Sequence, residues 1–171
     1  MTESVPAADA VSGLYRSLLE NTRSLQLSSL KGDQPEASYA PFIREGRDLY
    51  IFVSELACHT SNLISHAKAG VMLIEDEGQA KNLFARKRIT FNCQVEQVPT
   101  DSAEYPLLLD QMELRLGNTV SLLRSLPDFK LLRLVPVEGR FITGFGKAYD
   151  IDPLTDQLLH IDAQRIAGDK A

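Results

Sequence analysis

The sequence predicts a mainly β protein of the α+β class, with six or seven antiparallel strands forming a small barrel or sandwich flanked by helices. Apolar and polar residues alternate in several segments, most clearly over 86–98. Turn signals such as Lys31-Gly32-Asp33 separate neighbouring segments by only a few residues, as in antiparallel hairpins. The 171 residues, 44% of them hydrophobic, can bury one sizeable core but not two. We therefore expect a single domain over 1–171, with a loose tail at 1–7 and a C-terminal tail of uncertain structure at 150–171.

The first half of the chain predicts one long helix followed by three strands. Ala8 to Asn21 carries apolar residues at helical spacing. Strands are expected at 25–29, at 36–44 with an interruption at Pro41, and at 49–54, which is apolar on both faces.

A short helix and a buried strand should follow. The helix is expected within 55–69, begun by Thr60 or Ser61 as its N-cap and ended by Gly70. Residues 71–74 then form a compact apolar strand, and a polar, acidic segment follows it.

The second half predicts strands on both sides of a helical pair. In the strand over 86–98, one face carries Ile89, Phe91, Cys93 and Val95. Helices are expected at 101–116, capped by Asp101 or Ser102, and at 119–125. The last strands are expected at 129–137 and 139–149, with a bulge at Gly144-Phe145-Gly146.

Composition argues against several functional classes. A formal net charge of -5 disfavours nucleic acid as a partner. The first ten residues lack the basic and apolar regions of a secretory signal, and no apolar run approaches the ~20 residues that span a bilayer. The spacing of Cys58 and Cys93 does not indicate a zinc site and fits a reducing compartment. We expect a cytoplasmic protein without a membrane segment.

The first candidate site lies where a buried strand gives way to a helix, at Ser54 and at His59-Thr60-Ser61-Asn62. Free N–H groups and the positive end of the dipole at a helix N-terminus suit a phosphate. Hydroxyl and amide side chains add donors. The alternative is that Thr60 or Ser61 only caps the helix.

The second candidate site is Arg86-Lys87-Arg88. Three consecutive cations could neutralise a phosphate or the propionates of a haem. Alternation places Arg86 and Arg88 on the polar face and Lys87 on the core face of the strand. The alternative is a solvated strand end beside the acidic run Glu75-Asp76-Glu77.

Histidines are few and scattered, at positions 59, 66 and 160. His160 stands near the C-terminus and is the candidate metal ligand, although a lone histidine is more often a packed or surface residue. No metal cluster, catalytic triad or spaced carboxylate pair stands out, so no catalytic residue is assigned.

Several segments in register give this chain a likeness to a known family: 38–42, 54–63, 74–77, 83–91 and 144–149. They resemble the HugZ/HutZ haem-utilisation proteins of the pyridoxamine 5′-phosphate oxidase-like split-barrel superfamily, over roughly 14–149. The resemblance implies a split β-barrel working as a homodimer, with two ligand sites between the subunits.

The resemblance also implies an FMN site. Its phosphate would lie between Thr60–Asn62 and Arg86-Lys87, and the backbone at Tyr39, Ala40 and Pro41 would flank the ring. The Ser-Arg-Lys stretch of the flavin-binding relatives falls here on Ala57-Cys58-His59, which lacks the arginine.

The haem-degrading relatives imply a different ligand. Their tails carry His-x-x-x-x-x-His, in which the later histidine is the haem ligand. The first position corresponds here to His160 and the second to Ile166 or its neighbours Arg165 and Ala167, so only the first histidine is present to take over that role. Haem would then be held by His160, with Arg86 or Arg88 at the propionates.

Three functions follow in this order: a flavin-linked oxidoreductase with FMN, a haem-binding or haem-degrading protein, and a non-catalytic cofactor-binding dimer.

Overall fold

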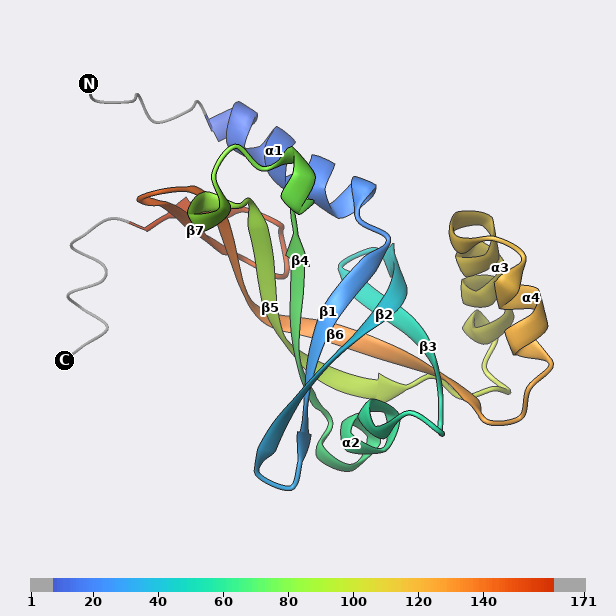
Figure 1. Ribbon diagram of the computed structural model, residues 1–171. Coiled ribbons are helices and arrows are strands. Elements are labelled where there is room, and N and C mark those ends of the chain that lie inside the picture. The colour runs from blue at the N-terminus through green and yellow to red at the C-terminus, as the bar shows by residue number, and fades with distance from the viewer. Residues whose placement is uncertain (1–7, 162–171) are drawn as a thin grey trace.

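The computed structural model describes residues 8–161, and its centre is one antiparallel sheet of eight strands in the order β3-β2-β1-β4-β5-β6-β7-β8 (Figure 1). β3 also pairs with β6, so six strands close into a ring and the β7–β8 hairpin extends the sheet beyond it. The strands are β1 (Ser24–Lys31), β2 (Gln34–Glu45), β3 (Asp48–Ser54), β4 (Lys68–Ile74), β5 (Arg88–Gln97), β6 (Phe129–Gly144), β7 (Lys147–Ile151) and β8 (Leu158–His160).

Alternation along the strands fills this ring. Ile89, Phe91, Cys93 and Val95 of β5 are all buried, as their period-two pattern predicts. β3 is buried on both faces, as expected, because its second face lies under the helical pair.

Helices cover the ring on three sides (Figure 1). α1 (Ala8–Asn21) lies across one end and buries Val11, Tyr15 and Leu19. α2 (Cys58–His66) lies at the opposite end. α3 (Glu104–Leu116) and α4 (Thr119–Arg124) pack beside β3 and form a second apolar cluster with Tyr50 and Phe52. Two single-turn 3-10 helices, η1 (Glu77–Gln79) and η2 (Leu83–Ala85), lie between β4 and β5.

The predicted boundaries of α2 are wrong at both ends. Its N-cap is Ala57, which makes no side-chain capping bond, and Cys58 is already helical. The helix ends at His66 because Ala67 takes a left-handed conformation with φ 52°, and Gly70 lies inside β4. Thr60 and Ser61 are therefore within the first turn and not at the cap.

The caps predicted for the next helix are also wrong. α3 starts at Glu104 and its N-cap, Ala103, makes no side-chain bond. The hydroxyl of Ser102 instead donates to the carbonyl of Pro99 in the preceding turn.

The C-terminal strands differ most from expectation, since the sheet has eight strands and not six or seven. β6 runs without a break through Gly139, where a Cβ would lie 2.8 Å from the Phe91 ring, so only glycine fits. The predicted irregularity at Gly144-Phe145-Gly146 is the β6–β7 turn, with a register shift before Gly144 and φ 64° at Gly146. Part of the expected tail at 150–171 is ordered strand, namely the end of β7 and all of β8. The tail predicted at 1–7 lies outside the described residues.

No helix in the described residues 8–161 combines the length and the apolar character needed to cross a membrane.

Candidate functional site

The side chains predicted at the start of α2 are committed to holding this helix in place. The buried Thr60 donates its hydroxyl to the Ser54 carbonyl at 2.6 Å. Ser54 in turn donates to Asp128 at 2.5 Å, and Ser61 to the Cys58 carbonyl at 2.9 Å. The Thr60 bond ties α2 to the end of β3, and all three bonds occupy hydroxyl protons that a phosphate would need.

Asn62 and His59 are likewise part of the local packing. The buried Asn62 amide donates to Ser29 at 3.1 Å and to Glu36 at 2.9 Å, which fastens α2 to the β1–β2 hairpin. Partial burial lowers the pKa of His59 below 6.5, so its imidazole favours the neutral form.

The three predicted cations differ in whether they pair with groups of the chain itself. Arg86 and Lys87 precede β5 and do not open it. Arg86 donates from Nε to the Glu75 carbonyl at 3.0 Å, and Lys87 pairs directly with the Glu75 carboxylate. Arg88 is half-buried, donates to the Arg86 carbonyl at 3.1 Å, and takes part in no ion pair within residues 8–161. Arg88 is therefore the best placed of the three to meet an external anion.

One subunit does not bring the two predicted halves of the site together. β4 starts just after α2, where Lys68 pairs with Gln94 of β5. Arg88 of β5 pairs with Ile74, at the other end of β4. Six residues of strand correspond to about 20 Å. Figure 1 accordingly shows α2 and the start of β5 at opposite ends of the ring.

The β2 residues predicted beside the ligand fall into different environments. Tyr39 is exposed and Ala40 is buried in the core. Pro41 lines a mostly apolar groove of about 380 Å³ between β2 and the α3–α4 pair, with Phe52 and Met112 among the other lining residues.

His160 is exposed on β8, the edge strand of the sheet. It lies directly opposite Tyr149 of β7, and the two rings meet edge to face at 5.2 Å between centroids. The Tyr149 ring also contacts Phe141 at 6.4 Å, and Phe141 contacts Tyr15 at 5.6 Å. A row of rings thus leads from the core under α1 to this exposed imidazole.

His160 and Arg88 lie on opposite faces of the sheet. Ile89, Phe141, Tyr149 and His160 are aligned across four strands and share one face. Arg88 projects from the other face, as alternation along β5 requires. One subunit therefore cannot place both side chains on one side of a flat ligand.

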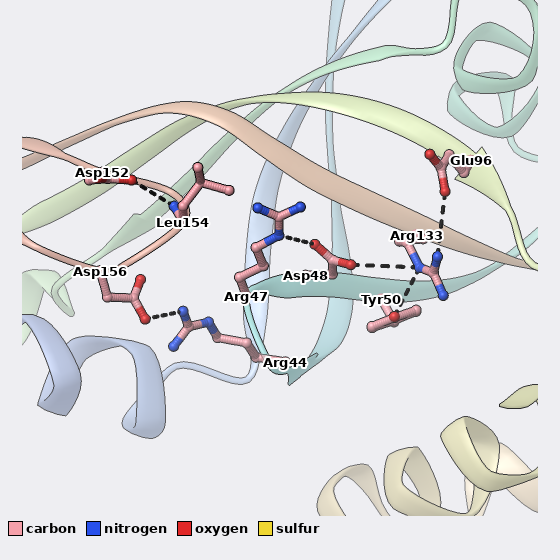
Figure 2. A network of polar contacts seen from close by, with 9 residues as sticks. All are labelled: Arg44, Arg47, Asp48, Tyr50, Glu96, Arg133, Asp152, Leu154 and Asp156. Carbon is pink, nitrogen blue, oxygen red and sulfur yellow. Dashed lines mark hydrogen bonds and ion pairs between the residues drawn. The ribbon is translucent and has the colours of Figure 1, made fainter.

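A carboxylate that the sequence reasoning missed anchors the β7–β8 turn. Asp156 accepts a hydrogen bond from the Tyr15 hydroxyl at 2.9 Å. It also accepts one from Arg44 at 2.6 Å, which Figure 2 shows. Burial, and then the charge of Asp156, raise the pKa of Tyr15 above its usual value, so the phenol keeps its proton and donates. These residues are far apart in the chain, and no local pattern connects them.

A second polar cluster surrounds Arg133 of β6 (Figure 2). Its guanidinium donates to Tyr50 at 2.9 Å and to Glu104 at 2.6 Å, and it lies 3.5 Å from Glu96. These contacts join α3 to three strands. We interpret this cluster as structural, because the Arg133 guanidinium is already paired with carboxylates of the chain itself.

The described residues contain no group of three histidine, cysteine or acidic side chains suited to a metal ion. Cys58 is exposed and Cys93 is buried, and burial raises the pKa of the Cys93 thiol to about 12. Cys93 is therefore an inert core residue.

The six-stranded ring with its flanking helices places the protein in the split-barrel class. The pyridoxamine 5′-phosphate oxidase family model matches residues 12–143, and the chain belongs to this family. Within it the chain is of the HutZ type: it is 38% identical over 146 residues to the heme oxygenase HutZ of Vibrio cholerae, covering 84% of this chain and 82% of that protein.

Solved structures agree with this assignment. The crystal structure of HutZ from Vibrio cholerae, described there as a heme storage protein, matches with a TM-score of 0.71 and 35% identity over 74% of this chain and 89% of that one. Campylobacter jejuni ChuZ matches with a TM-score of 0.83 and 26% identity, over 95% of this chain and 66% of ChuZ. The sequence alone led us to expect a flavin-linked oxidoreductase first and a haem protein second. These relatives favour the haem protein, and FMN binding has no comparable support.

Proposed function

We propose that this protein binds haem and takes part in haem utilisation, and that His160 would hold the iron. The observation that carries the proposal is the 38% identity to a heme oxygenase, HutZ. The exposed imidazole at the end of β8 is consistent with it. The second tail position, at Ile166 or its neighbours, lies outside the described residues.

The described contact of His160 with an aromatic ring is compatible with an imidazole that binds the iron of a haem. A neutral imidazole nitrogen is an ordinary haem ligand, and the Tyr149 ring supports one edge of this imidazole. Within residues 8–161 the buried hydroxyls of Tyr149 and Thr143 have no hydrogen-bond partner, which leaves two unsatisfied donors on the β6–β7 hairpin.

A homodimer accounts for the opposed faces of His160 and Arg88. We propose that Arg88 of one subunit faces the propionates of the haem held by His160 of the other. A guanidinium without a carboxylate partner within residues 8–161 suits that role. Bound haem supplies the centre at which oxygen is activated, while the protein orients the ring and reducing equivalents come from outside.

The test is a pair of absorption titrations of the purified protein, one with haemin and one with FMN. We expect a Soret band that saturates near one haem per chain and no comparable FMN complex. His160→Ala should shift or remove that band, because the side chain proposed to hold the iron is lost. His66→Ala is the matched control, since His66 is also exposed but lies on α2.

A flavin spectrum without a Soret band would instead support the oxidoreductase reading. If neither a Soret band nor a flavin spectrum appears at saturating haemin and FMN, the result would support the third function, a non-catalytic protein.

HutZ is described both as a heme oxygenase and as a heme storage protein, and the same preparation distinguishes these two activities here. We propose degradation as the activity. In air with ascorbate and an iron chelator, the Soret band should decay and the chelator should report released iron. A band that persists unchanged would favour storage.

A further inference from the structure

The position of His160 cannot be explained by its own strand alone. β8 has three residues, and within residues 8–161 it lies at the edge of the sheet and pairs with β7 alone. One further backbone bond, from Ile161 to the Ala148 carbonyl at 2.8 Å, extends this ladder. So short an edge strand, bonded on one side, opens easily unless something else holds it.

The β7–β8 turn is closed internally around Asp152. The Asp152 amide donates to the Gln157 carbonyl at 2.9 Å, and the Asp156 amide donates to the Asp152 carbonyl at 2.8 Å. The Asp152 carboxylate accepts from the Leu154 amide at 2.8 Å (Figure 2). Asp156 then adopts φ 57°, a left-handed conformation that aspartate tolerates better than most side chains.

The carboxylate of Asp156 fastens this turn to the body of the protein. Figure 2 shows the Arg44 guanidinium, on β2, pointing at one of its oxygens. The Tyr15 hydroxyl, on α1, reaches its other oxygen. Because Tyr15 is only 2% exposed and packs on Phe141, this donor is rigidly placed. The turn is thus held to two elements outside the hairpin.

A row of aromatic rings supports the β7–β8 hairpin from the face of the sheet that packs on the core. Tyr15, Phe141, Tyr149 and His160 follow one another in contact. Tyr15 therefore belongs to both connections: its hydroxyl holds Asp156, and its ring begins the row that ends at His160. A shift of the turn would move the imidazole relative to Tyr149.

We propose that Asp156, held by Tyr15 and Arg44, is a positioning residue that presents His160 to the haem iron. This inference rests on the proposed function, because it requires His160 to be the ligand. Asp156 does not touch the haem. It acts by restricting where the imidazole can lie, as residues outside the ligand set commonly do in metal sites.

The test compares Asp156→Asn with the wild type by the rate of haem transfer to excess apomyoglobin and by the absorption spectrum. Asparagine keeps the size of the side chain but loses the charge that Arg44 requires. Residues that orient metal ligands usually change affinity by about 10- to 100-fold, and we expect about tenfold faster haem loss here. Asp110→Asn is the matched control, because it breaks a 2.7 Å pair with Arg124 on the α3–α4 surface.

A double variant separates positioning from general destabilisation. Asp156→Asn added to His160→Ala should cause no further acceleration, because both act through the same imidazole. Additive effects would overturn the inference. So would haem loss at the wild-type rate in Asp156→Asn.

Failure of the inference and failure of the proposed function give different results. If His160→Ala leaves the spectrum and transfer rate unchanged, the ligand assignment is wrong and the inference falls with it. If His160→Ala loses the Soret band while Asp156→Asn behaves as wild type, only the inference is wrong. Should Asp156→Asn fail to fold, Tyr15→Phe is the second variant, because it removes a single donor to the same carboxylate. Haem loss from this variant should also be faster than from the wild type, but by less than in Asp156→Asn. Haem loss at the wild-type rate in Tyr15→Phe would contradict the proposal.

Discussion

Arg86 and Lys87 illustrate how a run of cations can be used within the chain. The acidic segment that precedes β5 folds back so that Glu75 meets both residues, through its carbonyl and its carboxylate. Burial opposes the charged form of Glu75, but the contacts with Lys87 outweigh it and hold the pKa of Glu75 below the usual 4.5. Of the three consecutive cations, this leaves Arg88 for an external anion.

The lowered pKa of Glu75 makes a prediction about stability and pH. A carboxyl group with a depressed pKa in the folded state stabilises the protein above its unfolded pKa, and this contribution is lost as the pH falls through the folded pKa. Glu75→Gln should therefore lower the free energy of unfolding at pH 7, by about 1 kcal/mol or less because the pair is near the surface. The difference from wild type should shrink below about pH 4.

Urea denaturation at pH 7, 5 and 3.5 checks this prediction. Glu77→Gln is the control, since Glu77 is 74% exposed and lies 3.9 Å from Arg86. A Glu75→Gln penalty that stays constant over this range would contradict the assigned pairing.

At the scale of elements, α1 is held at its C-terminal end by a side chain from α3. Nη2 of Arg115 donates to the carbonyls of Glu20 at 3.0 Å and Thr22 at 2.9 Å, and it lies 3.5 Å from that of Leu19. These carbonyls lie at the end of the helix, where intrahelical donors run out and a cation is favourable. The Arg115 guanidinium also lies 5.9 Å from the Phe42 ring centroid.

Arg115→Met should loosen the last turn of α1 while keeping the length of the side chain. Hydrogen bonds to charged groups contribute about 1.5–3 kcal/mol, and we expect a loss of stability in this range. Hydrogen exchange should accelerate in the last turn of α1, near Thr22, more than in the β5–β6 ladder. Arg124→Met is the control, because Arg124 pairs with Asp110 and Glu113 on the α3–α4 surface and, within residues 8–161, does not contact α1 carbonyls. Equal effects of the two substitutions would argue against this role for Arg115.

At the scale of the whole molecule, the outer face of the sheet is suited to close approach by another sheet. A shallow hollow of about 670 Å³ lies over β2, β1, β4 and β5. Ser28, Ala37 and Gly70 are among the residues that line it, and their small side chains leave the backbone accessible. We propose this face as the contact between two copies of the chain.

Ser28→Arg should prevent that contact without unfolding the protein, because Ser28 is exposed on the outer face of β1. Size-exclusion chromatography with light scattering should report a dimer for the wild type and a monomer for the variant, with unchanged circular dichroism. Gln111→Arg, on the exposed side of α3, should remain dimeric. A monomeric wild type would contradict the homodimer and the shared haem site together.

The sequence by itself determined the strands from β1 to β5, the buried face of β5, and the long helix at the start of the chain. These features are local: a period of two or of 3.6 residues specifies which side chains point inward, whatever the rest of the chain does. The bounds of α1 and the buried face of β5 therefore agree with expectation. The likeness of several segments to the HutZ type also led to the correct family.

Only the tertiary structure decided which polar residues meet. Thr60 bonds the Ser54 carbonyl instead of capping α2. Gly139 lies within a continuous strand, and the residue there is glycine because Phe91 of the neighbouring strand leaves no space for a Cβ. The hydrogen bond between Tyr15 and Asp156 joins residues separated by 141 positions. Such contacts depend on how strands pair across the sheet, and local periodicity carries no information about which distant segment will become a neighbour.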